Sequence, residues 1–317
     1  MKILVYGAGV QGSVYAARLK QAGNEVSILA RGTRVEQIRV HGIVLREWPD
    51  GSESETPVDI VERLTPEDEY ELVIVSVRRN QLADIIPTLA SNSRVPTFLF
   101  LLNNATGFGE IMDRLGPSRV IAGFPSVGGS REGYVINYQL ISEQPTTIGE
   151  LDGTRSERLK RVRKVIEKAG FSVVCTSSID AWLKTHAAFI ISIVGALYIT
   201  GGDSYKLARM PDTIRLMVRS IREGFQELQR QGITITPFKL LVLFLWLPSI
   251  VAVMYWRGYL GSERGDQTIA RHARAAVDEM KELVEELRDL DVAGAGRTPA
   301  LDRLCLAIDQ EPLTREP

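Results

Sequence analysis

The first thirty residues place a glycine-rich turn between two apolar stretches. Residues 1–8 read MKILVYGA, residues 13–19 continue at helical spacing, and residues 26–30 form a second apolar stretch. The order strand, GxGxxG turn, helix and strand is typical of a dinucleotide-binding unit, in which the helix N-terminus attracts phosphate. The alternative is a structural turn that binds nothing. The predicted phosphate-binding residues are Gly7, Gly9, Val10, Gln11 and Gly12.

Two arginines follow the second of these strands. Residues 30–34 read ARGTR and contain no acid. An acid here would accept a hydrogen bond from the ribose 2′-hydroxyl of NAD, whereas arginine accommodates the 2′-phosphate of NADP. Guanidinium groups bind phosphate through charge-assisted, bidentate hydrogen bonds. Arg31 and Arg34 therefore favour NADP(H), the alternative being that both are solvated loop charges.

Strands and helices alternate through the first half of the chain. Residues 71–77 form a continuous apolar run, as expected for a parallel strand that is buried on both faces. Similar strands are predicted at residues 97–102 and 120–124, with helices at residues 80–90 and 108–115. This alternation predicts an α/β Rossmann-type fold with a doubly wound sheet, whose ligands bind at the carboxyl ends of its strands.

The pattern changes after residue 126 and again after residue 177. Shorter strands are predicted at residues 43–45, 134–138, 146–149 and 171–174, with a helix at residues 155–169. Only helical periodicity remains in the last part of the chain. The helices predicted there cover residues 179–199, 212–231, 236–256, 266–290 and 299–308. We therefore expect an NADP-binding Rossmann domain in residues 1–176 and an all-α domain for substrate binding and dimerisation in residues 177–317.

Charge and composition exclude several classes of protein. The chain has 38 basic and 39 acidic residues, so its net charge of −1 gives no field that would attract nucleic acid. Its two cysteines lie far apart and its three histidines have no metal-ligand spacing, which argues against a disulfide framework and a metal site. Free cysteines fit a reducing compartment, and the first strand begins at residue 2 without a signal peptide. We therefore expect a cytoplasmic protein.

One stretch is unusually apolar. Residues 240–256 carry no charge and lie between Lys239 and Arg257. A membrane-spanning helix needs about 20 apolar residues, and Pro248 would break a helix in the middle of this run. We expect a buried helix pair, or a subunit interface in a homodimer, rather than a membrane span.

Hydride transfer to a carbonyl needs a proton donor and an orienting dipole, because the carbonyl oxygen becomes an alkoxide. Residues 77–81 and 103–107 supply polar groups at the ends of two predicted strands. Lys184 supplies a third candidate, at the start of a helix that is otherwise apolar down to Ile199.

Together these features resemble the ketopantoate reductase family. The resemblance rests on GAGVQGSVYAARL, the arginine after the second strand, a basic residue with Gln81, the asparagine loop, and the W-x-K of residues 182–184. It covers essentially the whole chain, more strongly in the first half. It implies a Rossmann domain with an all-α domain, and reduction of 2-dehydropantoate to pantoate by NADPH. It further implies Lys184 as general acid, Asn104 in contact with nicotinamide and substrate, and Arg78 behind the cofactor.

The chain departs from the family where substrate is bound. The family commonly has asparagines four and eight residues after the lysine, and here Ala188 and Ser192 stand there. Further along the chain, the family has a serine and then a glutamate that bind the substrate. Ser262 is the candidate for the serine, but Ala275 or one of its neighbours stands at the position of the glutamate. Arg271 or His272 could replace that glutamate and would suit a substrate with a second carboxylate. The candidate substrate residues are therefore Ser192, Ser262 and Arg271.

These residues leave structural alternatives open. Lys184 could lay its stem on an apolar surface, Asn104 could cap a turn, and Arg78 could be solvated. The sequence favours an NADPH-dependent reductase of a small 2-oxo acid. The alternatives are a related dehydrogenase for another hydroxy acid or an opine-like substrate, and an NADP(H)-binding sensor without turnover.

Overall fold

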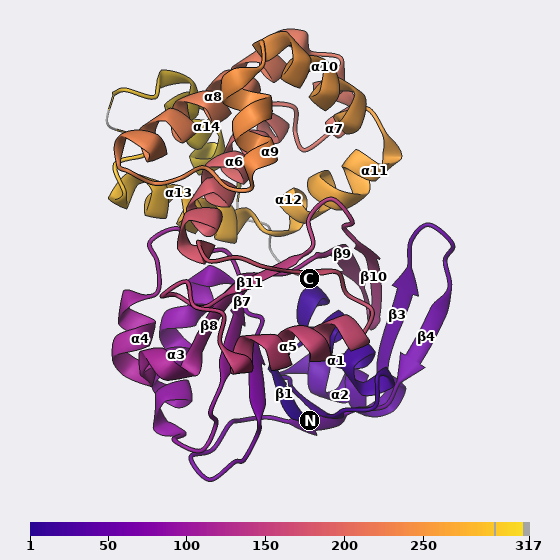
Figure 1. Ribbon diagram of the computed structural model, residues 1–317. Helices are drawn as coiled ribbons and strands as arrows, with labels where there is room; N and C mark the ends of the chain where they lie inside the picture. Colours follow the sequence, from indigo (N-terminus) through magenta and orange to yellow (C-terminus); the bar gives the residue numbers. More distant parts are fainter. Residues whose placement is uncertain (295, 313–317) are drawn as a thin grey trace. The chain divides into compact units, whose positions relative to one another are not determined.

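The chain forms two units (Figure 1). The computed structural model describes residues 1–294 and 296–312, without the side chains of residues 272 and 275. The first unit comprises Met1–Leu102 and Phe108–Ile179. The second comprises the loop Asn103–Gly107 and the chain from Asp180 onward. The loop therefore groups with the helices of the second unit, although it directly follows a strand of the first.

An eight-stranded sheet forms the centre of the first unit. Its strands are β1 Lys2–Tyr6, β2 Glu25–Leu29, β5 Asp59–Val61, β6 Leu72–Val75, β7 Phe98–Leu101, β8 Val120–Phe124, β11 Thr146–Gly149 and β12 Val173–Cys175. The strand order is β12-β11-β8-β7-β6-β1-β2-β5, and every neighbouring pair is parallel except β8 with β11. The chain runs outward in opposite directions from β1 and β6. Ligands bind at such a switch point, beside the carboxyl ends of its two strands.

Helices cover both faces of this sheet. They are α1 Val10–Gln21, α2 Thr33–His41, α3 Leu82–Ser91, α4 Gly109–Leu115 and α5 Glu157–Lys168. Figure 1 shows α1 and α5 on one side of the sheet and α3 and α4 on the other. Because both faces are covered, β6 and β7 consist entirely of buried residues. The predicted doubly wound α/β fold is confirmed.

A second, four-stranded sheet packs on the outer side of α1. Its strands are β4 Glu53–Thr56, β3 Ile43–Glu47, β10 Val135–Leu140 and β9 Val127–Glu132, in that order. The hairpin of β9 and β10 lies where short strands were expected. The parallel pairing of β3 with β10 was not predicted, because it joins segments about ninety residues apart. The sequence of β4, ESET, has no apolar alternation that would have marked it as a strand.

The glycines of the first turn have distinct steric roles. Gly7 has a φ of +118°, and a Cβ atom there would lie 2.3 Å from the carbonyl oxygen of Ser76. A Cβ atom on Gly12 would lie 2.0 Å from the carbonyl oxygen of Gly7. On Gly9 it would meet nothing within 4 Å. The close approach of the turn to Ser76 therefore requires Gly7, and the packing of α1 against the turn requires Gly12. The surface above Gly9 is open to a ligand.

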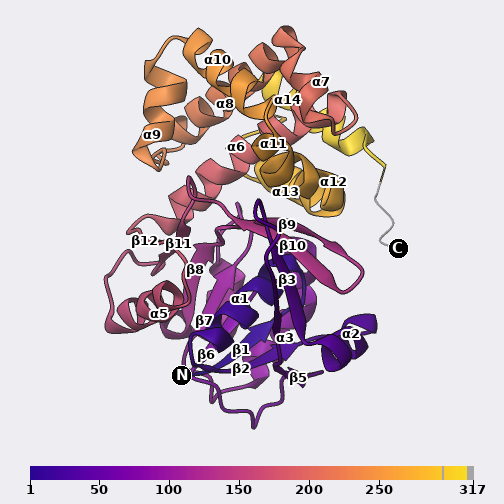
Figure 2. The same cartoon turned by 90° about the vertical axis from the view of Figure 1, so that its right-hand side faces the viewer.

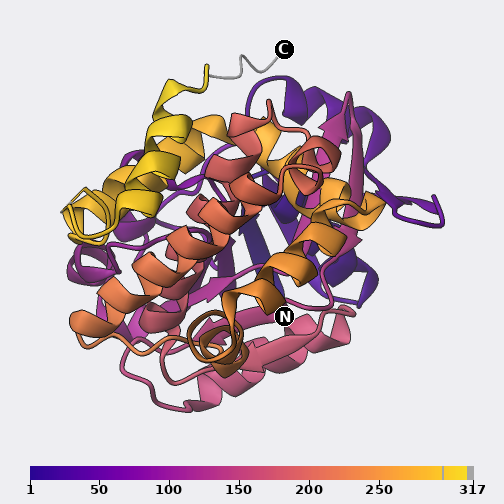
Figure 3. The same ribbon diagram turned by 90° about the horizontal axis from the view of Figure 1, so that it is seen from above.

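The second unit is built from helices around α6. They are α6 Ile179–Ile199, α7 Ser204–Ala208, α8 Pro211–Arg230, α9 Phe238–Leu241, α10 Ser249–Leu260, α11 Glu263–Gly265, α12 Arg271–Ala275, α13 Val277–Asp289 and α14 Pro299–Gln310, with π-helical turns η3 Val242–Trp246 and η4 Asp266–Ala270. Figure 3 shows α8 running diagonally between the yellow α14 and the orange α10, both of which it contacts. The predicted all-α part is confirmed.

The helix α6 is long and apolar enough to cross a membrane, but 78% of its most apolar window is buried. It approaches its neighbours closely through small residues. Gly224 of α8 faces Ala188, and Gly195 faces the backbone of Leu304 in α14. The helix therefore serves as the core of its unit.

Two predicted helices are interrupted. The helix expected over residues 236–256 breaks before Pro248, so that α9 with η3 meets α10 at 117°. Proline cannot continue the helix because it lacks an N–H and restricts the residue before it. The helix expected over residues 266–290 divides into η4, α12 and α13. Of the two arrangements expected for the apolar run, complete burial within its own unit is not observed, since Trp246 and Met254 are 64% and 69% exposed. The other arrangement, a subunit interface, stays a prediction.

The substitution Gly12→Ala should destabilise the first unit, because the added Cβ atom would collide with the backbone of Gly7. We expect a loss of about 1–3 kcal/mol in the free energy of unfolding, measured by urea denaturation. Gly9→Ala is the matched control and should unfold nearly as the wild type does, because its Cβ atom enters open space. Equal losses for the two variants would contradict this account.

Candidate active site

The glycine turn presents the N-terminus of α1 at the switch point of the large sheet. Gly9 is the N-cap residue and has no side chain that could cap the helix. Val10, Gln11 and Gly12 form the first turn, whose N–H groups have no intrahelical acceptors. Such an end, with the positive pole of the helix dipole, binds phosphate. The structure thus brings the five predicted phosphate-binding residues together.

Arg34, at the start of α2, is a buried cation that pairs with no acid in the described part of the chain. It is 6% exposed, and it donates to Gln37 Oε1 at 3.0 Å and to Ser13 Oγ and the Tyr134 carbonyl at 3.4 Å, all neutral acceptors. Among the described residues its Nε has no hydrogen-bond partner and its guanidinium has no carboxylate partner. Burial and the positive charge of Arg131 lower the pKa of Arg34 to about 10. Because buried charges are normally paired, this environment favours an added anion.

The other two predicted cofactor cations lie on the same unit. Arg31 follows β2 and is exposed, whereas Arg78 is half-buried beyond the end of β6. The backbone N–H of Arg78 donates to Gln81 Oε1 at 3.3 Å. Since β1 and β6 are neighbours, Arg78 and the glycine turn share one edge of the sheet.

Asn104 closes its own loop. Its Nδ2 donates to the Gly107 carbonyl at 2.8 Å, and its Oδ1 accepts from the Gly107 N–H at 3.0 Å. The residue is only 2% exposed. The turn-forming role that the sequence left open is therefore present in the structure, and one N–H of the amide remains for another acceptor.

Two buried glutamates of α13 hold this loop, and neither is among the residues predicted from the sequence. Glu279 Oε1 accepts from Asn103 Nδ2 at 2.7 Å. Glu286 accepts from the Ala105 N–H at 2.6 Å and from Thr106 Oγ1 at 3.2 Å. Their seven-residue spacing puts both carboxylates on one face of the helix. Acids at this interval along an otherwise apolar helix face are the signal that could have revealed them.

Lys184 lies in the second turn of α6. Its Nζ is 2.5 Å from Asp180 Oδ2, and the side chains of Lys184 and Asp180 are 15% and 45% exposed. Pairing with Asp180 fixes the direction of the ammonium group but uses only one of its three N–H donors. A second acceptor can therefore be bound.

Each of the predicted substrate residues has a partner within the helical unit. Ser192 is fully buried and hydrogen-bonds to Ser220 Oγ at 2.7 Å, between α6 and α8. Ser262 caps α11 through the N–H of Gly265 at 3.2 Å. Arg271 Nε lies 3.6 Å from Asp266 Oδ2. The side chains of residues 272 and 275 lie outside the described residues, so the replacement of the family glutamate stays a prediction.

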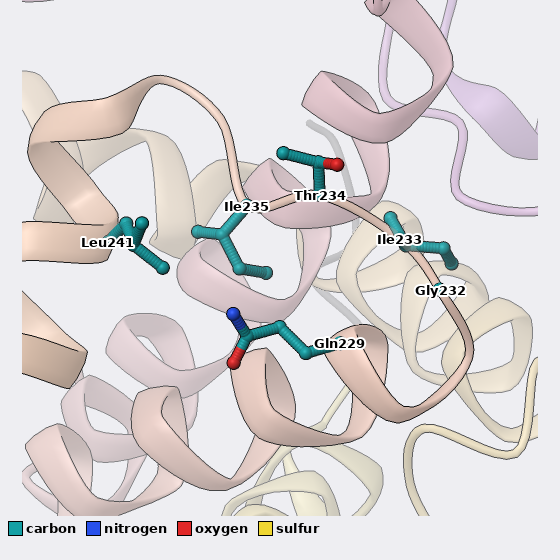
Figure 4. Close-up of a pocket in the computed structure, with 6 residues that line it drawn as sticks. All are labelled: Gln229, Gly232, Ile233, Thr234, Ile235 and Leu241. Atoms are coloured by element: carbon teal, nitrogen blue, oxygen red, sulfur yellow. The ribbon is translucent and has the colours of Figure 1, made fainter.

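A cavity of about 240 Å³ lies between the end of α8 and the start of α9 (Figure 4). Its lining residues are Gln229, Gly232, Ile233, Thr234, Ile235 and Leu241. None of these side chains ionises, so this cavity offers no counter-ion to a carboxylate substrate. In the described part of the chain, no three His, Cys, Asp or Glu side chains form a group that could hold a metal ion.

Sequence comparison relates the chain to reductases. Residues 3–153 match the family model for "Ketopantoate reductase PanE/ApbA". The 2-dehydropantoate 2-reductase of Mesorhizobium japonicum is 29% identical over 223 residues, which are 62% of this chain and 67% of that protein. The 2-dehydropantoate 2-reductase of Pyrococcus horikoshii is 26% identical over 250 residues, which are 76% and 79% of the two chains.

Solved structures share the fold over nearly the whole chain. The 2-dehydropantoate 2-reductase of Geobacter metallireducens has a TM-score of 0.77 at 16% identity and covers 98% of this chain and 99% of its own. D-mandelate dehydrogenase, in a ternary structure with NADH and anilino(oxo)acetate, has a TM-score of 0.73 at 18% identity, covering 98% and 97%. These comparisons confirm the predicted resemblance, and the chain is an oxidoreductase related to the ketopantoate reductases.

Proposed function

We propose that this chain reduces a small 2-oxo acid with NADPH, as a 2-dehydropantoate 2-reductase does. The proposal rests on two features of the first unit: the helix N-terminus at Gly9, which no side chain caps, and the buried guanidinium of Arg34, which has no carboxylate partner among the described residues. The helix N-terminus suits a pyrophosphate, and the guanidinium of Arg34 suits a further phosphate. The similarity to two named 2-dehydropantoate 2-reductases supports the same reading.

The residues of the first unit fit NADP(H). Backbone N–H groups from Gly9 to Gly12 would bind the pyrophosphate, with Gly7 shaping the turn. Arg34, with the exposed Arg31 beside it, would bind the 2′-phosphate. A pKa of about 10 leaves Arg34 charged at neutral pH, so its affinity for phosphate persists there. Bound in this way, NADPH supplies the hydride.

The helical unit would supply the proton. Lys184 donates from Nζ to the carbonyl oxygen of the substrate as that oxygen gains negative charge. Asp180 keeps the ammonium in place through its contact at 2.5 Å. The free N–H of the Asn104 amide orients the same carbonyl, and Glu286 holds the backbone of the Asn104 loop. We propose Arg78 as a further cofactor contact at the carboxyl end of β6.

The residues at the expected substrate-binding positions support a second candidate function, a dehydrogenase for a less polar hydroxy acid. Ala188 and Ser192 stand where the resemblance implies asparagines, and both are fully buried between helices. Ala188 has no polar side-chain group, and the hydroxyl of Ser192 is already hydrogen-bonded to Ser220 Oγ. Ser262 and Arg271 would then be the remaining polar contacts to the substrate. For either substrate, we propose a cytoplasmic enzyme that acts as a homodimer.

Lys184→Ala should lower kcat/KM by about 10²–10⁴-fold, because the general acid is lost. NADPH binding should be unchanged. Activity is measured as NADPH oxidation with ketopantoate and a panel of other 2-oxo acids. Lys206→Ala, on the exposed side of α7, is the control and should keep full activity. Unchanged turnover in Lys184→Ala would refute the acid role, and NADPH binding without turnover of any 2-oxo acid would indicate a sensor.

Arg34→Met should reduce the preference for NADPH over NADH by about tenfold or more, because a phosphate contact is worth at least about 1.4 kcal/mol. The free protein should melt no lower than the wild type, since the substitution removes a buried unpaired charge. Fluorescence titration with both nucleotides and thermal denaturation measure these effects. Arg39→Met, on the exposed face of the same helix, is the control. A lower Tm with an unchanged nucleotide preference would make Arg34 a structural clamp.

A further inference from the structure

The helix α13 carries two carboxylates on a part of its surface that is otherwise apolar. Its leucine, valine and methionine side chains are buried in the helical unit, and so are Glu279 and Glu286, which are 7% and 3% exposed. Figure 2 shows α13 next to α12, which it contacts. Burying a carboxylate costs free energy unless hydrogen bonds replace those it made with water. Both glutamates obtain such bonds from the loop Asn103–Gly107.

Of the two glutamates, Glu286 makes the more extensive contact with this loop. One of its carboxylate oxygens accepts from the Ala105 N–H at 2.6 Å, and the other accepts from Thr106 Oγ1 at 3.2 Å. Thr106 Oγ1 in turn lies 3.4 Å from Asn104 Oδ1. Carboxylates accept stronger hydrogen bonds than neutral groups do. Glu286 therefore fixes the two residues that directly follow Asn104.

The end of the same loop lies beside the proposed proton donor. Gly107, to which the Asn104 amide is hydrogen-bonded, has a φ of +91°, and a Cβ atom there would lie 3.3 Å from Asp180 Oδ1. The other oxygen of this carboxylate, Asp180 Oδ2, is 2.5 Å from Lys184 Nζ. All four residues belong to the helical unit. The orienting amide and the ammonium group are therefore carried by one unit.

We propose that Glu286 is a positioning residue of the reductase, which acts through the loop and keeps the Asn104 amide in place relative to the Lys184 ammonium group. This inference rests on the proposed function, in which both groups meet one carbonyl oxygen. Residues 103–107 form neither helix nor strand, so their conformation depends on such anchors. A misplacement of about 1 Å at a reacting group can cost about 100-fold in rate.

The variant Glu286→Leu tests this role, because leucine fills the apolar surroundings but accepts no hydrogen bond. We expect kcat to fall by about 10–100-fold with the 2-oxo acid that the wild type reduces fastest. The dissociation constant of NADPH should be unchanged, because the glycine turn and Arg34 belong to the other unit.

Two further variants serve as controls. Glu286→Gln should recover most of the activity, because its amide oxygen can accept from the Ala105 N–H and its amino group can donate to the Thr106 hydroxyl. Glu285→Leu replaces the exposed acid next to it on α13 and should keep full activity. Unchanged kcat in Glu286→Leu would overturn the proposal, as would an equal loss in Glu286→Gln.

A double-mutant cycle separates positioning from a general loss of stability. Asn104→Ala removes the amide through which Glu286 is proposed to act. In the Asn104→Ala background, Glu286→Leu should change kcat by less than about twofold, because residues that act through one network are not additive. A loss by the same factor with and without the Asn104 amide would overturn the proposal.

Hydrogen exchange of the Ala105 amide tests the anchor without any activity. This N–H should exchange at least about tenfold faster in Glu286→Leu, because its hydrogen bond to a carboxylate is lost. Unchanged exchange would overturn the proposal. If instead exchange rises as expected but the wild type reduces no 2-oxo acid, the proposed function fails, and with it the positioning role, while the anchor itself is shown to exist.

Circular dichroism checks that Glu286→Leu is folded. Should it not fold, Thr106→Val removes one of the two contacts from the side of the loop. We expect this variant to lower kcat in the same direction but by a smaller factor, again with unchanged NADPH binding. Full activity in Thr106→Val together with an unfolded Glu286→Leu would make Glu286 a residue of the core alone and would overturn the proposal.

Discussion

The close fit of α1 against the central strands is the contact on which the nucleotide-binding unit depends. Gly7 and Gly12 leave no room for a Cβ atom, and α1 lies between the large sheet and the small one. This fit sets the helix N-terminus at the switch point between β1 and β6. The positions of Gly9 and of the backbone N–H groups that would meet the pyrophosphate follow from it.

A buried charge adds a second reason to expect an anion at this unit, beside the backbone N–H groups of α1. Most charged groups in buried positions have a partner, as Arg158 has in Glu150. Arg34 has neutral partners alone among the described residues, and its neighbour Arg131 has the same sign. A buried guanidinium without a carboxylate partner lowers the free energy of unfolding, and a bound anion can reverse this loss. In the helical unit, the buried carboxylates of Glu279 and Glu286 do have partners, because each accepts a hydrogen bond from the loop Asn103–Gly107.

Local sequence patterns predicted much of this structure. The glycine turn, the buried strands and α6 follow from spacing and apolar runs, because their causes lie within a few residues. Three features depend on distant partners and could not be predicted. The strand β3 pairs with β10, Glu286 reaches a loop about 180 residues away, and Ser192 bonds to Ser220 across two helices. Pro248 predicted a break in the apolar run, but not that the broken helices would expose their apolar side.

The most direct test of the account is calorimetric titration of the wild type with 2′,5′-ADP and with 5′-ADP. The two ligands differ in the phosphate that Arg34 is proposed to bind, and neither involves the substrate. We expect 2′,5′-ADP to bind at least about tenfold more tightly, with the difference lost in high salt as charge contacts are screened. Equal affinities would contradict the claim that the buried guanidinium selects NADP(H).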